Sequence, residues 1–207
     1  MALKLLQPPK LEPITLGTAK NYLKLDHDDD DAFLNNLIKT ARKAVEAFTG
    51  KCLIMQTWQF SVNSGFASAL SDGTYLEGMR SRGKGGIELP KNPFIQLEGD
   101  PEIVDDYGHR TIKDFRLDQS GRTARLHFGP SIISLTEGRG VVNISFTVGY
   151  GNKVEDVPEP FSHAILIALA NLYENRGGPA NDNFLVPPAL PQSAIDLLLP
   201  YRSARLK

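Results

Sequence analysis

The spacing of apolar residues changes twice along this chain of 207 residues, and that change constrains the fold more than any other feature. From residue 29 to 49, apolar side chains recur every three or four residues, as on one face of a helix. After Gly50 they alternate instead, most clearly in Val141–Val148, which is typical of strands with one buried face. Helical spacing returns over residues 161–176. These changes predict a helical scaffold interrupted by a β insertion.

Residues at the ends of the predicted helices support their placement. Thr15 is a suitable cap for a short first helix, and Gly50 is a suitable terminator for the long second one. Pro158 and Pro160 precede the third helix, where proline is tolerated. The predicted helices cover residues 15–25, 29–49, 161–176 and 193–199.

Short segments with alternating polarity fill the middle of the chain. In the first of them, Trp58, Phe60 and Val62 alternate with polar residues. Several short strands separated by turns suggest a small antiparallel sheet or a barrel-like unit. The glycine-rich residues 64–86 are interpreted as a long loop or an irregular hairpin. The predicted strands cover residues 55–63, 86–89, 94–97, 103–107, 115–117, 124–128 and 141–148.

The predicted fold class is α+β, with N-terminal helices and a C-terminal helix packed together around an inserted small antiparallel β unit. A single α+β domain is expected over 14–176, helical at 14–50 and 161–176, with the β insertion at 55–150. Residues 1–13 contain three prolines and are expected to form an extended arm. Residues 177–207 are expected to form a proline-rich loop, a short helix and a basic tail.

Composition excludes several classes of protein. The formal net charge of −1 gives no overall basic excess for nucleic-acid binding, and 41% hydrophobic residues suffice for a folded core. One cysteine, Cys52, cannot form an internal disulfide, which fits an intracellular origin. We expect neither a signal peptide nor a membrane span, because the longest apolar stretch, residues 164–170, is too short.

A glycine-rich basic segment, residues 78–84, has the glycine and lysine spacing of a phosphate-binding loop. That loop requires a hydroxyl residue next and then a helix, to bind magnesium and the phosphates. Here Gly85 follows, and then a predicted strand, so a nucleotide site is not expected. The loop 78–91 is interpreted as a solvated loop or, alternatively, as a contact with DNA or an acidic partner through Arg80, Arg82 and Lys84.

The acidic run of residues 26–31 resembles the start of a calcium-binding loop. The match fails at the sixth and twelfth positions, which require glycine and glutamate but hold Asp31 and Leu37. We therefore expect these carboxylates to cap the long helix and favour its positive end. An acidic contact between subunits is the alternative.

No other pattern in the sequence indicates catalysis. The histidines have no metal-binding spacing and no nearby cysteine, and neither a nucleophile elbow nor a dinucleotide-binding turn is present. We therefore predict no enzyme, no catalytic residues, no metal and no cofactor. The histidines are His27, His109, His127 and His163.

Several short motifs, taken in order, resemble one family over about residues 14–202. They are Ile14-Thr15-Leu16, residues 19–26, residues 28–32 with the long helix to Lys51, Gln56-Thr57-Trp58, residues 87–90 with Asn92-Pro93, residues 146–151, Val157-Pro158, Ala164-Ile165 with residues 173–176, and residues 199–202. This order is similar to that of phage head–tail connector (adaptor) proteins of the longer, β-inserted type, which also occur in prophages and gene transfer agents. The longer stretch 64–86 and the loop 179–191 depart from the usual pattern.

The resemblance implies a structural virion protein without catalytic residues. It implies a ring, usually dodecameric, that docks on the portal protein in the neck, extends the DNA channel and contacts a tail-side completion or tail terminator protein. DNA would pass without sequence readout, and the chain would be made in the cytoplasm of a host bacterium. The alternative function is a nucleic-acid-binding module that uses loop 78–91.

The two ends of the chain and helix 161–176 are predicted to make the assembly contacts. Helix 161–176 is apolar nearly all round, so it serves either the core or a subunit contact. The C-terminal segment carries basic residues and no acidic one after residue 199, and it would reach the portal or a neighbouring subunit. The candidate contact residues are Tyr201, Arg202, Arg205 and Lys207.

Overall fold

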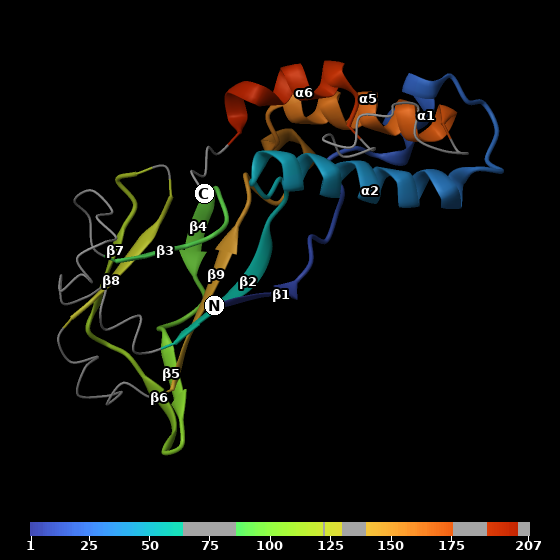
Figure 1. The fold of residues 1–207 in the computed structure, drawn as a ribbon. Helices are drawn as coiled ribbons and strands as arrows, with labels where there is room; N and C mark the ends of the chain where they lie inside the picture. Colours follow the sequence, from blue (N-terminus) through green and yellow to red (C-terminus); the bar gives the residue numbers. More distant parts are fainter. Residues whose placement is uncertain (64–85, 122, 130–139, 176–189, 203–207) are drawn as a thin grey trace. The chain divides into compact units, whose positions relative to one another are not determined.

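The computed structural model describes residues 1–63, 86–121, 123–129, 140–175 and 190–202. The described chain forms two compact units. The β unit combines residues 1–8 with 56–148, and the helical unit combines residues 9–55 with 149–207. Both units are discontinuous in sequence, because the chain enters the β unit, leaves it, and returns to it after the first two helices. Each unit is described by itself below (Figure 1).

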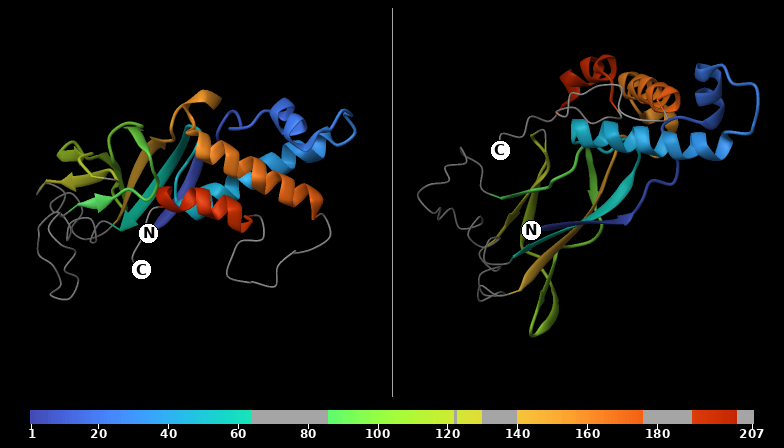
Figure 2. Two further views of the ribbon diagram at one scale, coloured as in Figure 1. Left: turned by 90° about the horizontal axis from the view of Figure 1, so that it is seen from above. Right: turned by 45° about the vertical axis from the view of Figure 1, so that its right-hand side comes forward.

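The helical unit contains four α-helices among its described residues, and Figure 2 shows α5 running alongside α2 and α6. Its core is formed by apolar side chains from all four helices and from the segment after α2, including Ile38, Leu53 and Phe161. Short 3₁₀ turns precede α5 and follow α6. The elements are α1 (Leu16–Leu23), α2 (Asp31–Thr49), η1 (Val154–Asp156), α5 (Glu159–Glu174), α6 (Gln192–Leu198) and η2 (Leu199–Tyr201).

The helix ends follow the sequence signals. The Thr18 amide donates to the Thr15 hydroxyl over 3.1 Å, which caps α1. Gly50 adopts a left-handed conformation with φ of 72° and donates its amide to the Glu46 carbonyl, which ends α2. Pro160 lies in the first turn of α5, where a missing amide proton breaks no helical hydrogen bond.

In the β unit, the larger sheet is antiparallel and has the strand order β1-β2-β9-β5-β6, with β4 also paired to β9. The long strand β9 is central: β2 pairs with it along one edge, and β4 and β5 share the other edge (Figure 1). The core side chains on β9 are Val142, Ile144, Phe146 and Val148, as its alternation predicts. The strands are β1 (Ala2–Gln7), β2 (Gln56–Asn63), β4 (Phe94–Leu97), β5 (Glu102–Asp105), β6 (Gly108–Thr111) and β9 (Val141–Val148).

A smaller antiparallel sheet has the order β3-β8-β7 and completes the described β unit. Leu126 and Phe128 are buried, whereas His127 between them is only partly buried, which agrees with the predicted alternation in this segment. Gly86 is required beside it, because a Cβ at this position would lie 2.9 Å from the His127 ring and the Leu126 carbonyl. The strands are β3 (Ile87–Glu88), β7 (Phe115–Asp118) and β8 (Arg125–Phe128).

The predicted α+β class is confirmed, with helices before and after the β insertion along the chain. The structure adds two strands that the sequence did not indicate, β1 in the expected arm and β6 between the predicted strands 103–107 and 115–117. The single domain over 14–176 stays a prediction; the two compact units divide the described chain differently. None of the described helices combines the length and the apolar character that crossing a membrane requires.

Candidate functional site

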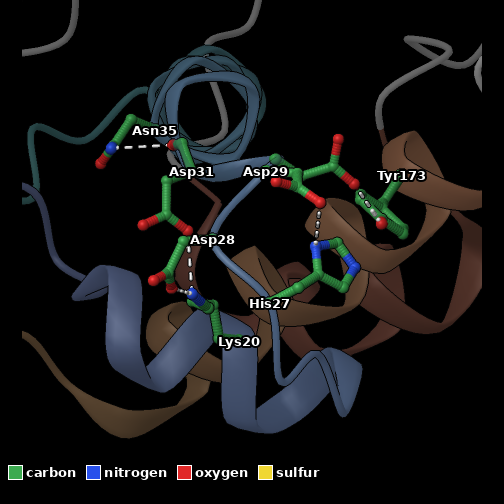
Figure 3. A network of polar contacts seen from close by, with 8 residues as sticks. Lys20, His27, Asp28, Asp29, Asp31, Asn35 and Tyr173 are labelled. Carbon is green, nitrogen blue, oxygen red and sulfur yellow. Dashed lines mark hydrogen bonds and ion pairs between the residues drawn. The ribbon is translucent and has the colours of Figure 1, made fainter.

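The acidic run forms a polar network inside the helical unit (Figure 3). The Lys20 ammonium on α1 donates to the carboxylates of Asp28 and Asp31, the latter over 2.9 Å. The Asn35 side-chain amide donates to the Asp31 carbonyl over 2.9 Å. These contacts hold α1 against the start of α2, so part of the acidic run has a structural role within one subunit.

A second contact ties the same run to α5. The Tyr173 hydroxyl donates to the Asp30 carboxylate over 2.6 Å (Figure 3). Asp30 occupies the N-cap position of α2, but its side chain makes no capping hydrogen bond. The predicted side-chain cap is therefore replaced by a bond between helices, although Asp31 in the first turn still suits the helix dipole.

The ion pairs of this network shift the pKa values of Lys20 and Asp28, each in the direction that favours the charged form. Hydrogen bonding to Lys20 lowers the pKa of Asp28 below 3.8, and hydrogen bonds to Asp28 and Asp31 raise the pKa of Lys20 above 10.5. The Asp29 carboxylate remains 97% exposed, with the His27 Nδ1 atom 3.9 Å away. Among the described residues, including the carboxylates of the acidic run, no group of three or more side chains is placed to hold a metal ion.

The C-terminal candidate residues are divided between described and undescribed parts of the chain. Tyr201 packs on Phe161 with ring centroids 5.0 Å apart, and Phe161 in turn contacts Tyr150 at 5.5 Å. Burial, and then the neighbouring Tyr201, raise the pKa of Tyr150 above its usual range. The Arg202 guanidinium lies over the Phe48 ring at 5.1 Å. Residues 199–202 are thus anchored on α2 and α5 of their own subunit.

The remaining candidate residues lie outside the described part of the chain. Arg205 and Lys207 follow the last described residue, and Arg80, Arg82 and Lys84 fall within residues 64–85, which the structure does not describe. Lys91, at the end of that basic segment, lies over the Trp58 ring at 5.0 Å. The contact roles of all these residues stay predictions.

Helix α5 buries much of its apolar surface in the core of the helical unit. Phe161, Ile165 and Leu169 are fully buried, together with Ala164 and Ala168. Leu166, Ile167 and Leu172 are partly buried and pack against the same core. The apolar character of this helix is therefore largely explained by its position in the helical unit.

Among the described elements of the β unit, β1 is the most exposed apolar one, and it lies in the N-terminal arm that was predicted to make assembly contacts. All six of its residues are exposed, and Leu3 and Leu5 retain 37% and 39% of their accessible surface. Among the described strands it pairs only with β2, so none of them covers its outer edge. The prolines at positions 8, 9 and 13 obscured the strand, because they favour a reading as an arm.

Comparison with known proteins gives matches by sequence family and by structure. No curated protein matches the chain. A chain in the "Neck of empty GTA particle computed with C6 symmetry" is similar in fold, with a TM-score of 0.72 and 19% identity, covering 100% of this chain and 98% of the other. A chain in the "Neck of native GTA particle computed with C12 symmetry" gives a TM-score of 0.66 and 21% identity, with the same coverage.

The sequence family that matches is described as "Phage gp6-like head-tail connector protein", and the match spans residues 13–93. This segment includes α1, α2, β2 and β3, and it contains the motifs at residues 14–32, 56–58 and 87–93 on which the resemblance partly rests. The resemblance to head–tail connector proteins inferred from the sequence is confirmed, and residues 13–93 carry it.

Proposed function

We propose that this chain is a structural head–tail connector subunit, which forms a ring in the neck of a tailed phage or a gene transfer agent. The observation that carries the proposal is the coincidence of two independent matches. Residues 13–93 match a connector family, and the whole chain shares its fold with chains of neck particles. No step of this role requires catalysis, so the absence of enzymatic activity is part of the proposal.

Cyclic symmetry in the neck particles supports the ring. The symmetries of those particles, C6 and C12, both place copies head to tail around an axis. The copy number of this chain's ring is part of the proposal, with twelve as the expected value. The proposed partners are the portal protein on the head side, and a completion or terminator protein on the tail side.

The proposed portal contact is the C-terminal tail, and the contacts of Tyr201 and Arg202 indicate where the chain can be truncated to test it. Deleting residues 200–207 would also remove Tyr201, which covers Phe161 in the core. A chain that ends at Arg202 keeps both anchors and loses Arg205 and Lys207. We expect this variant to fold normally and to attach less well to the portal, as measured by co-purification with assembled portal rings.

The control for this truncation is the full-length Arg205→Gln, Lys207→Gln chain, which keeps the tail length and removes two charges. Loss of attachment in both variants would assign the contact to charge, and loss in the truncation alone would assign it to the segment itself. If both variants join heads to tails as well as the unaltered chain does, the docking role of the tail is wrong. A chain that is absent from purified necks would contradict the connector role itself.

A further inference from the structure

A continuous apolar row crosses the larger sheet from one open edge to the other. Leu5 on β1 is paired with Trp58 on β2, and Trp58 is paired with Phe146 on β9. Phe146 is also paired with Leu97 on β4. Directly paired residues of antiparallel strands point to the same face, so these four side chains share the core face. The row thus ends in a leucine at each side of the sheet.

Both terminal strands of this row offer an open backbone edge. Among the described strands, β1 pairs only with β2 and β4 pairs only with β9. Exposed apolar side chains accompany the open edges, with Leu3 and Leu5 on β1 and Ile95, which is 38% exposed, on β4. An open edge with apolar side chains is a template for adding another strand.

Charge selects which edges fit together. Residues 1–10 contain Lys4 and Lys10 and no acidic residue, whereas residues 94–102 contain three acidic residues and no basic one. The three are Glu98, which directly follows β4, Asp100, which pairs with Lys113, and Glu102, which lies on β5. The other outer strand, β6, has His109 and Arg110, and its row ends on Arg110, paired with Ile103. The β4 edge, where the row ends on Leu97 next to Glu98, therefore suits the basic, apolar β1 better than the β6 edge, where the row ends on Arg110.

We propose that β1 of one copy of this chain adds to the open edge of β4 of the next copy, which continues the larger sheet from subunit to subunit. The contact joins two different edges, so it is heterologous and can close into a ring. It places Leu3 or Leu5 of one copy beside Leu97 of its neighbour and brings Lys4 near the acidic segment 94–102. The inference rests on the proposed ring, and it specifies the surfaces that form it.

Cysteine cross-linking in assembled necks tests the contact. The double variants Leu5→Cys, Leu97→Cys and Leu3→Cys, Leu97→Cys cover two registers on the core face. Cβ atoms of cross-strand neighbours lie about 4.5–5.5 Å apart, near the range that a disulfide requires. Under mild oxidation, at least one double variant should give a covalent ladder that extends beyond dimers on a non-reducing denaturing gel. The single variants should remain monomeric.

The matched control is Lys4→Cys, Leu97→Cys, which places one thiol on the opposite face of β1. An equal ladder from this control, or no ladder from either test variant in intact necks, would overturn the proposal. Dimers from Leu5→Cys alone would indicate a two-fold β1–β1 contact and would also overturn it. Each of these results leaves the connector role intact, because that role depends on the presence of the chain in necks.

If the cysteine substitutions themselves prevent assembly, a variant with an added charge tests the same contact. Leu5→Lys adds an edge-blocking charge at an exposed position, and Tyr107→Lys, at a residue that is 83% exposed, is its control. Both variants should keep the circular dichroism spectrum of the unaltered chain. Only Leu5→Lys should be lost from assembled necks; equal incorporation of both variants would contradict the β1–β4 contact.

Discussion

At the scale of single residues, the helical unit depends on a buried ionic network that sequence patterns did not reveal. Arg42 lies in α2, and its Nε and Nη1 atoms donate to Glu12 and Glu46 over 2.6 and 2.7 Å. The second Glu46 oxygen accepts the Leu53 amide over 2.9 Å. No sequence pattern indicated this pair, because Glu12 lies thirty residues before Arg42.

Replacing Glu46 with alanine should lower the free energy of unfolding by about 3 kcal/mol, the lower end of the range for breaking a buried ion pair, because Arg42 keeps Glu12. The variant also leaves the buried Leu53 amide without its acceptor. Urea denaturation monitored by circular dichroism provides the measurement. Lys39→Ala, at an exposed site on the same helix, should change stability by less than about 0.5 kcal/mol. Equal effects of the two variants would contradict the role of the network.

Glu98 provides a residue-scale test in the β unit. Its carboxylate accepts the Thr147 hydroxyl over 2.6 Å and the Gln96 amide over 2.9 Å, and these bonds lower its pKa below 4.5. Thr147→Val should therefore raise the pKa of Glu98 toward 4.5, as measured by NMR titration of the side-chain carbonyl. An unchanged pKa would show that the hydroxyl does not stabilise the carboxylate.

The same shift fixes the sign of the pH dependence. Because the pKa of Glu98 is lower in the folded state, its contribution to stability is present above about pH 4.5 and is lost as the pH falls through the lowered value. The Thr147→Val variant should thus lose less stability on acidification than the unaltered chain. Asp118→Asn, at a carboxylate on the other sheet, should leave the Glu98 titration unchanged.

At the scale of elements, the sequence predicted the long, periodic segments well and missed the edge strands β1 and β6. The bounds of β4 and β9 match the predictions, and α2 begins two residues later than predicted and ends at the predicted Thr49. Helix α2 and strand β9 each have one buried face, so their periodicity is visible. Strands β1 and β6 lie at sheet edges. Few of their side chains are buried, so their sequences need not alternate between apolar and polar residues. The acidic run was identified, but its partners Lys20 and Tyr173 depend on tertiary structure.

The connection that follows β9 should be sensitive to a single added methyl group at Gly149. Gly149 has φ of +138°, and a Cβ there would lie 2.7 Å from the backbone of Ile54 and Met55. Gly149→Ala should cost at least about 3 kcal/mol, because strain and a backbone clash add. Gly99→Ala, with φ of +89° and open space around it, should cost only about 1 kcal/mol. Similar melting temperatures for the two variants would disprove the steric argument.

At the scale of the whole molecule, two cores are built from interleaved stretches of one chain. The helical core takes residues from both sides of the β insertion, from Ile14 to Leu198. Inside the helical unit, the two ends of the insertion are held together. Met55 donates its amide to the Gly151 carbonyl over 2.8 Å, and Tyr150 donates to the Leu53 carbonyl over 3.1 Å. An independent helical scaffold that tolerates an insertion at this place would account for the interruption seen in the sequence.

This arrangement predicts that the helical unit folds without the β unit. A chain that begins at Pro9 and replaces residues 56–148 with a short Gly-Ser linker keeps all four described helices and their core. It should show a helical far-ultraviolet spectrum and a cooperative thermal transition, because loop closure between adjacent ends costs little entropy. Its matched control carries Phe161→Ala in the same shortened chain, which empties the core and should lower stability by about 3–5 kcal/mol. A shortened chain without a cooperative transition would mean that the helical core requires the β unit, and that the insertion is an integral part of one folding unit.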